Sequence, residues 1–152
     1  MIQVHIGIHV GTVADLSRWR GKYLAAAKEP CHRDAVGYTG RGCPKDHPEY
    51  FVAVRNKGMI LNLVDGESSD WVDKGMMQQA LAFITPEPAT LIVCNQGHSR
   101  SPSIALMWLL QNKHIQADTF EEAEKTFSLL YKNYRPAKGI RQFSKQFFEE
   151  LQ

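Results

Sequence analysis

The sequence predicts a single α/β domain with a central, mostly parallel sheet of about four to five strands flanked by helices. Segments typical of strands alternate along the chain with helical patterns, which is the order that a parallel sheet requires. The length of 152 residues suits one domain with its own hydrophobic core. The content of 43% hydrophobic and 22% charged residues is ordinary for a globular protein. We therefore take residues 1–152 as one domain.

Four strands are expected from the apolar patterns. Residues 2–10 alternate apolar and polar side chains with the period of two that a half-buried strand shows. Residues 50–54 and 59–64 predict two strands joined by a tight turn. Residues 89–93 form a short, continuous apolar run, which indicates a buried strand.

Helical patterns occupy most of the remaining chain. A short one covers residues 12–27, and a longer one begins at Ser68 or Ser69 and continues to Ile84. A buried helix follows Arg100, with Pro102 in its first turn. The sequence then predicts a helix opened by the capping box Thr119–Glu122 and ending near Tyr131, and a last helix over residues 140–151.

The segment of residues 28–50 breaks this order. It has no regular period and is rich in Pro, Gly, His and basic residues, so it predicts a long irregular insertion or loop. Loops of that length are more often functional or disordered than idle. One interpretation is that the loop lies beside a pocket and presents polar side chains to a ligand, and the other is a plain surface crossing. The side chains in question are Arg33, Tyr38, Arg41, Lys45 and His47.

This segment also contains good zinc ligands in Cys31, His32, Cys43 and His47. Their spacing lacks a paired Cys-x2-Cys, and adjacent ligands rarely serve one tetrahedral ion. We therefore expect no metal site.

Composition limits the partners. A net charge of +2 does not favour nucleic acid or a membrane surface. No run of about 18 apolar residues is present, and the start MIQVHIGIHV resembles a strand rather than a signal peptide. The odd count of three cysteines indicates a reducing compartment. We therefore expect a cytoplasmic monomer with no nucleic-acid or membrane partner.

The stretch IVCNQGHSRSPS, residues 92–103, carries the chemistry. It delivers Cys94 from a strand and reaches Arg100 where a helix begins. Such a loop aims backbone N–H groups and the positive end of the helix dipole at one point, which makes an anion site and favours the thiolate form of a cysteine. Gly97 allows a tight curl, and the guanidinium of Arg100 matches two oxygens of a phosphate. The alternative to an anion site is that Cys94 is only a small, buried apolar residue and that an ordinary turn follows it.

The pattern Cys94-x5-Arg100, with Gly97 and Ser99-Arg100-Ser101 in place, resembles the signature of the cysteine-based protein tyrosine phosphatases, and most closely the small dual-specificity type. The resemblance covers roughly residues 59–151. It implies hydrolysis of phosphomonoesters, chiefly phosphotyrosine and phosphoserine/threonine in proteins, through a phosphocysteine intermediate. It implies no cofactor and no metal.

The resemblance also assigns roles to residues. Cys94 would attack phosphorus, Arg100 would hold the phosphate and Ser101 would hydrogen-bond the thiolate. Asp65 lies 29 residues before Cys94, at the end of a buried strand, where the family has its general acid. The rest of the loop would bind the phosphate mainly through backbone N–H groups, and these residues are Asn95, Gln96, Gly97, His98 and Ser99.

Other interpretations remain open for two of these residues. Asp65-Gly66 is also a common turn pair, and Asp70 and Asp73 are competing acids, although both fall within the helix expected from Ser68 or Ser69. Ser101 could cap the helix that follows the loop.

One departure from the family concerns Val93, because a histidine usually stands immediately before the nucleophile. A second hypothesis is therefore a module of the same fold that binds phosphorylated ligands without hydrolysing them. A third is sulfur transfer or arsenate reduction. Sulfur transfer needs no acid such as Asp65, and arsenate reduction would need Cys31 or Cys43 as resolving thiols.

Overall fold

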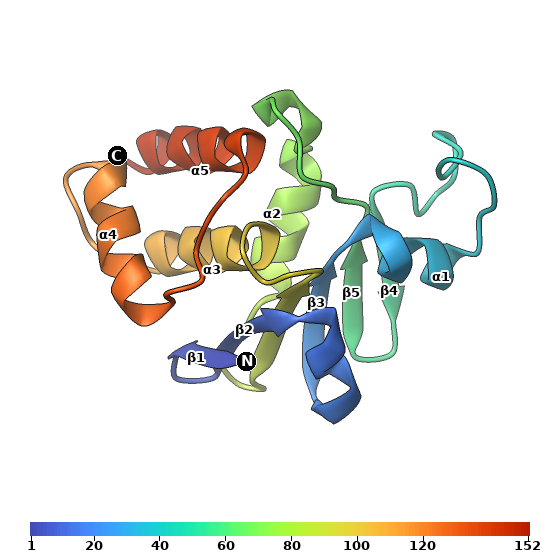
Figure 1. The fold of residues 1–152 in the computed structure, drawn as a ribbon, viewed down its shortest axis with the longest axis horizontal. Helices are drawn as coiled ribbons and strands as arrows, with labels where there is room; N and C mark the ends of the chain where they lie inside the picture. The colour runs from blue at the N-terminus through green and yellow to red at the C-terminus, as the bar shows by residue number, and fades with distance from the viewer.

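A six-stranded sheet forms the centre of the computed structural model, which describes residues 1–152 (Figure 1). The strands are β1 (Ile2–His5), β2 (Ile8–Thr12), β3 (Lys22–Ala26), β4 (Val52–Arg55), β5 (Gly58–Leu61) and β6 (Thr90–Cys94). Their order is β1-β2-β6-β3-β5-β4. The four inner strands run parallel, and β1 and β4 are antiparallel at the edges. The α/β class with a mostly parallel sheet is confirmed, with more strands than the four to five expected.

The single strand expected at residues 2–10 is instead a hairpin of β1 and β2. The turn lies at Ile6-Gly7, and Gly7 has φ +79°, which favours glycine. A Cβ at Gly7 would meet the carbonyl oxygen of Pro86 at 2.1 Å. His5 pairs with Ile8 across the turn, and a register irregularity between Gln3 and His5 then brings Ile2 opposite Val10. Because of this irregularity the even-numbered apolar residues of both strands face the same side, and the sequence pattern runs through the hairpin without a break.

The helix expected over residues 12–27 is also wrong. Only Val13–Arg18 is helical, as a short 3-10 turn, and β3 follows it. β3 lies between β6 and β5 and carries Leu24, Ala25 and Ala26, all buried. Alanine and leucine are strong helix formers, so local propensity favoured a helix, but burial between two parallel strands decided the conformation.

Helices cover both faces of the sheet unequally. One face is packed against α2 (Lys74–Phe83) and α3 (Arg100–Gln111), and α4 (Phe120–Leu130) and α5 (Lys138–Leu151) pack on α3 (Figure 1). α3 is buried along almost its whole length, as expected for a central helix. The other face has a smaller core that includes Val93 and is covered by Val13–Arg18 and the start of the 28–50 segment. No helix is both long enough and apolar enough to cross a bilayer.

The helix expected from Ser68 or Ser69 to Ile84 begins later. Ser68 caps only a 3-10 turn, Ser69–Trp71, and α2 starts at Lys74 behind a second cap. That cap is Asp73, whose Oδ2 accepts a hydrogen bond of 2.8 Å from the backbone N–H of Met76. Asp70 and Asp73 therefore lie in separate turns rather than inside one helix. The expected cap at Thr119 is confirmed, since its hydroxyl accepts from the N–H of Glu122 at 3.1 Å.

The 28–50 segment contains a helical turn (Lys28–His32) and the short α1 (Arg33–Val36), followed by turns. His32 holds the segment together from inside. Its side chain is fully buried, Nε2 donates to the carbonyl oxygen of Glu49 at 2.8 Å, and Nδ1 lies 3.0 Å from the Tyr38 hydroxyl. Both ring nitrogens are thus occupied. Nowhere in the chain do three or more His, Cys, Asp or Glu side chains come together in a way that could hold a metal ion.

This arrangement predicts a pH dependence of stability. Burial lowers the pKa of His32 below its ordinary value, so the unfolded chain binds a proton more readily than the folded one. Folding stability is therefore fully present above the unfolded pKa of about 6.5 and falls as the pH drops below it. We expect the melting temperature to decrease between pH 7.5 and pH 5.5. Hydrogen exchange in residues 28–50 should accelerate over the same range.

A His32→Gln variant is the control for this effect. Glutamine keeps a donor and an acceptor but does not titrate in this range, so its melting temperature should change less between the two pH values. An equal decrease in both proteins would assign the effect to other groups.

Candidate active site

Cys94 ends β6, the strand at the middle of the parallel sheet, and is 2% exposed. Residues 95–99 form a compact turn from the carboxyl end of β6 to the first residue of α3, Arg100 (Figure 1). Ligands of open α/β sheets bind at this edge, beyond the carboxyl ends of the strands. The loop is therefore in the position where the sequence placed it.

The Cys94 thiol is held by Ser101. Its Sγ lies 3.2 Å from the Ser101 Oγ, which in turn lies 3.1 Å from the carbonyl oxygen of Gly11 on β2. A hydroxyl has one proton, so it can donate either to the carbonyl or to a thiolate. Ser101 is completely buried, and rotation of its hydroxyl is the only movement this exchange requires.

The loop amides are free to bind an anion. None of the backbone N–H groups of residues 95–99 donates to an acceptor within the protein. Gly97 has φ +72°, and a Cβ there would approach the Tyr131 hydroxyl to 3.0 Å and Thr12 to 3.2 Å. Successive unpaired amides at the start of a twelve-residue helix form an anion-binding concavity.

Residues 131–137, which we call the strap, hold this loop from outside. The Tyr131 hydroxyl donates to the carbonyl oxygen of Gly97 at 2.7 Å, and the N–H of Arg135 donates to that of His98 at 2.7 Å. In a trans peptide the C=O and the following N–H point in opposite directions. Because the strap draws two carbonyls outward, the N–H groups of His98 and Ser99 point away from it, toward the inside of the loop.

Tyr131 is buried, and its hydroxyl stays protonated. Desolvation by burial, together with the charges of Cys94 and Asp15, raises the pKa of Tyr131 to about 12. We expect Tyr131→Phe to weaken the affinity for inorganic phosphate by about fivefold to tenfold, because one hydrogen bond of about 1 kcal/mol is lost from the loop. The affinity is measured as protection of Cys94 from iodoacetamide by phosphate.

Tyr134→Phe is the matched control for this measurement. Tyr134 lies on the same strap, but its hydroxyl donates to Glu124 Oε2 at 2.6 Å and does not touch the loop. Phosphate affinity should be unchanged in this variant. Equal losses in both variants would mean that the strap acts only through general stability.

Arg100 is 9% exposed and directed across the loop. Its Nη1 donates to the carbonyl oxygen of Leu63 at 2.9 Å, and its Nη2 donates to Asn95 Oδ1 at 2.7 Å. The Nε is buried and donates no hydrogen bond. A buried guanidinium N–H that makes no hydrogen bond is costly, and a bound anion would supply the acceptor.

Asp65 lies beside this guanidinium, in the loop that follows β5. Its Oδ2 is 3.5 Å from the Arg100 Nε, and its Oδ1 accepts from the Ser99 hydroxyl at 2.8 Å. The Ser99 oxygen also accepts from the N–H of Ala137 on the strap at 2.8 Å. The Asp65 side chain remains 39% exposed, so it borders solvent above the loop. The structure therefore brings Cys94, Arg100, Asp65 and Ser101 into one site, whereas Asp70 and Asp73 lie on the turns beyond it.

Asn95 joins the site to the 28–50 segment. Besides accepting from Arg100, it donates through Nδ2 to the carbonyl oxygen of Glu29 at 2.7 Å. The side chains of Asn95 and Ser99 thus make hydrogen bonds within the site, while their backbone N–H groups stay unpaired. Gln96 is exposed and its side chain makes no hydrogen bond within the protein, and His98 Nδ1 lies 3.3 Å from the carbonyl oxygen of Asn133.

The side chains proposed to serve a ligand from residues 28–50 do not all face this site. Arg33 is paired with Glu29 at 2.7 Å and lies over the Tyr38 ring, and His47 caps its own turn by accepting from the N–H of Glu49. Val93 is fully buried in the small core on the far face of the sheet, one residue from Cys94 but pointing the opposite way.

Sequence reasoning missed several residues of the site. Tyr131 counted only as an apolar position of a helix, and Leu63 and Gly11 contribute backbone carbonyls that no side-chain pattern reveals. The only available signal was an aromatic residue, Tyr131, at the end of the helix expected from Thr119.

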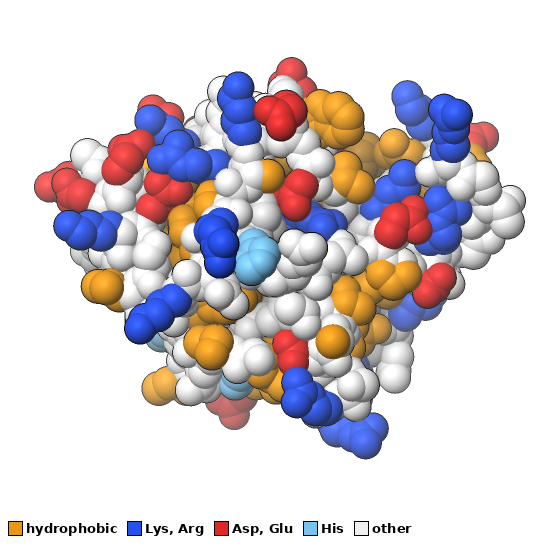
Figure 2. All heavy atoms as spheres, in the orientation of Figure 1, with side chains coloured by type: hydrophobic (Ala, Val, Ile, Leu, Met, Phe, Trp, Pro, Cys, Tyr) orange, Lys and Arg blue, Asp and Glu red, His pale blue; other side chains and the backbone are white.

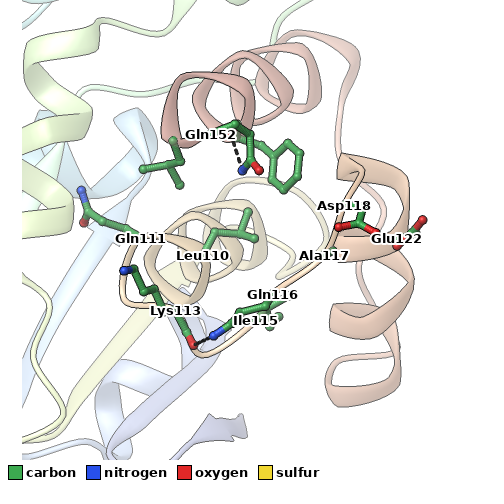
Figure 3. Close-up of a pocket in the computed structure, with 11 residues that line it drawn as sticks. Leu110, Gln111, Lys113, Ile115, Gln116, Ala117, Asp118, Glu122 and Gln152 are labelled. Atoms are coloured by element: carbon green, nitrogen blue, oxygen red, sulfur yellow. Dashed lines mark hydrogen bonds between the residues drawn. The ribbon is translucent and has the colours of Figure 1, made fainter.

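A large cavity of about 630 Å³ lies away from Cys94. Figure 3 shows it between the end of α3, residues 113–118 and the C-terminal turn of α5, with Gln152 bonded to the backbone of Phe148. It contains none of the residues of the loop.

No protein-family model and no curated protein matches the sequence. Solved structures do match the fold. A leucine rich repeat and phosphatase domain containing protein from Entamoeba histolytica has a TM-score of 0.65 at 15% identity, covering 99% of this chain and 91% of the other. Human DUSP28 has a TM-score of 0.64 at 12% identity, with coverage of 99% and 97%.

A third similar structure is PTPMT1 in complex with PI(5)P, with a TM-score of 0.61 at 12% identity and coverage of 98% and 94%. The chain has the α/β fold of the small dual-specificity phosphatases, the type within the cysteine-based tyrosine phosphatase superfamily that the Cys94–Arg100 pattern resembles.

Proposed function

We propose that this protein hydrolyses phosphomonoesters through a phosphocysteine intermediate. The observation that supports this most strongly is the arrangement around Cys94. A thiol hydrogen-bonded to a buried serine lies beside a loop of unpaired amides, and the Nε of Arg100, at the end of this loop, makes no hydrogen bond and has the Asp65 carboxylate 3.5 Å away. A phosphoryl group bound there would have its oxygens on the amides and the guanidinium, and its phosphorus above the sulfur.

In the first step the Cys94 thiolate attacks phosphorus, an S–P bond forms and the ester P–O bond breaks. Asp65 in its protonated form donates a proton to the leaving oxygen. The loop amides and Arg100 hold the equatorial oxygens, where charge is greatest in the transition state.

In the second step water attacks the phosphocysteine. The Asp65 carboxylate takes the proton of the water, the S–P bond breaks and inorganic phosphate leaves. The Ser101 hydroxyl stabilises the departing thiolate by turning its proton from the carbonyl of Gly11 to the sulfur, which the observed distances of 3.1 and 3.2 Å support. The cycle uses side chains, amides and water.

The substrates proposed are proteins phosphorylated on tyrosine or on serine and threonine. We propose that residues 1–152 act as one phosphatase domain, with the 28–50 segment as its irregular insertion, working as a monomer in a reducing, cytoplasmic setting. The reducing setting is needed because an oxidised Cys94 could not attack phosphorus.

The test is phosphate release from phosphotyrosyl, phosphothreonyl and inositol phosphate substrates across a range of pH. Release from at least one phosphopeptide, with a bell-shaped pH profile that reports a base and an acid, is the expected result. Tight phosphopeptide binding with no release at any pH would contradict hydrolysis.

That second outcome would favour the alternative, a module of the same fold that binds phosphorylated ligands. The contacts of Asp65 are the observation that favours this alternative. Both of its carboxylate oxygens already face Ser99 and Arg100, at 2.8 and 3.5 Å, so a substrate must displace a contact before the acid reaches a leaving oxygen.

A further inference from the structure

A groove lined by aromatic side chains lies next to the proposed catalytic site. It has a volume of about 240 Å³. We define the aromatic groove by Tyr50, Phe51, Val64 and Trp71, which line it together with Lys28, Gly42, Cys43, Asn62, Asp73 and Met76. The buried Cys43 and Met76 lie among the lining residues, at 8% and 1% exposure.

The groove gathers apolar side chains that folding leaves in water. Trp71 is 63% exposed, Phe51 is 44% exposed and Val64 is 36% exposed. Single exposed apolar residues are ordinary, but three around one hollow mark a binding surface. Figure 2 shows hydrophobic side chains collected between the top of α2 and the 28–50 segment, on the same face of the molecule as the loop before α3.

The groove is continuous with the catalytic site through the backbone. Val64 stands between Leu63, whose carbonyl oxygen accepts from Arg100 Nη1 at 2.9 Å, and Asp65. The N–H of Lys28, another lining residue, donates to the same carbonyl at 3.1 Å. One wall of the groove is therefore also a wall of the proposed catalytic site.

Trp71 packs against the loop that carries Asp65. Its ring packs on Gly66, where an added Cβ would meet the indole at 3.0 Å, so the indole lies one residue beyond Asp65. Tyr50 and Phe51 also line the groove and contact each other edge to face, with ring centroids 4.9 Å apart. Tyr50 belongs to the 28–50 segment and Phe51 directly follows it, so this insertion forms part of the groove.

We infer that the aromatic groove binds an apolar side chain of a phosphorylated protein, within two residues of the phosphorylated position. This inference rests on the proposed function. The volume is below the roughly 300 to 1,000 Å³ of pockets that enclose whole small molecules, and it suits one or two side chains. Aromatic walls bind leucine, methionine or phenylalanine by excluding water from both surfaces.

The experiment compares kcat/KM for matched phosphotyrosyl peptides. One set carries Leu or Phe at one of the two positions on either side of the phosphotyrosine, and the reference carries Ala at all four. The best apolar peptide should exceed the reference by about tenfold or more, the discrimination that a few methylene groups provide in an apolar pocket. In Trp71→Ala this ratio should fall to about one, and Trp71→Phe should restore most of it.

Two controls accompany these variants. Leu129→Ala removes another exposed apolar side chain, 79% exposed on α4, and should keep the wild-type ratio. Val64→Ser changes another apolar side chain that lines the groove, so it should also lower the ratio if Trp71→Ala proves poorly folded. Each ratio is taken within one protein, so it does not depend on how far the variant changes turnover itself.

The outcomes separate this inference from the proposed function. If the wild type releases no phosphate from any substrate, hydrolysis fails, and the groove is judged by fluorescence anisotropy of the same labelled peptides on the Cys94→Ser protein. Equal kcat/KM values, or equal affinities in the binding assay, for all peptides would refute the inference that the groove binds an apolar side chain. A wild-type ratio that persists in both Trp71→Ala and Val64→Ser would also overturn it. So would preferential hydrolysis of a phosphoinositide in vesicles that is insensitive to Trp71→Ala.

Discussion

Replacing Cys94 by serine is expected to abolish phosphate release, with a fall in kcat of about 10⁵-fold or more, comparable to the loss of other covalent nucleophiles. A serine hydroxyl has a far smaller fraction of its nucleophilic anion near neutral pH than a thiol, and no general base lies beside Cys94 to activate it. The only close polar partner of Sγ is Ser101, at 3.2 Å. The measurement is phosphate release from an aryl phosphate.

The anion site itself should survive this change. The unpaired amides of residues 95–99 and the Arg100 guanidinium do not depend on the sulfur, so labelled phosphopeptide should still bind. Cys31→Ser is the matched control, because Cys31 is another free thiol and packs against the smaller core on the other face of the sheet. It should retain full activity. Undiminished turnover in the Cys94→Ser protein would refute the phosphocysteine mechanism.

Asp65→Asn is expected to lower kcat by about 10²-fold to 10⁴-fold, the contribution that a positioned acid usually makes. Asparagine keeps the shape of the side chain and can still accept from the Ser99 hydroxyl, so the loop should retain its form. It cannot protonate the leaving oxygen. The loss should therefore be larger for an alkyl phosphate, whose leaving group is a strong base, than for p-nitrophenyl phosphate.

Asp70→Asn separates this effect from a general loss of charge. Asp70 is exposed in the 3-10 turn five residues further on, and its carboxylate makes no hydrogen bond or ion pair. This variant should behave as the wild type toward both substrates. A similar loss in the two variants, or no dependence on the leaving group, would remove Asp65 from the role of acid.

The sequence predicted the secondary structure better in the later part of the chain than in its first part. From residue 50 onward, most local patterns agreed with the structure: a tight turn between two strands, a cap at Thr119 and a buried helix after Arg100, although α2 begins later than expected. These segments have strong local signals, and the tertiary fold agrees with them. In the first 27 residues, the hairpin of β1 and β2 looked like one strand and β3 looked like helix.

The reason for those errors is physical. The register irregularity between Gln3 and His5 keeps the even-numbered apolar residues of β1 and β2 on one face, so the alternation looks the same as in one straight strand and periodicity cannot separate the two. In β3, Ala25 and Ala26 are buried between two parallel strands, where their small size fits, although their helix propensity is high. The conformation of both segments is determined by contacts that no local sequence pattern contains.

The sequence by itself determined the chemical groups of the candidate site: a thiol, a guanidinium and a helix start at a six-residue spacing, with a carboxylate after a buried strand. A short loop brings these groups together through local geometry, so spacing was sufficient to find them. Only the tertiary structure decided what surrounds them. The hydroxyl of Tyr131 reaches the carbonyl of Gly97, Arg100 reaches the carbonyl of Leu63, and the 28–50 segment closes a groove against Trp71. These contacts join residues far apart in the sequence, and many use backbone atoms that every residue carries. For both reasons, no pattern of side chains could predict them.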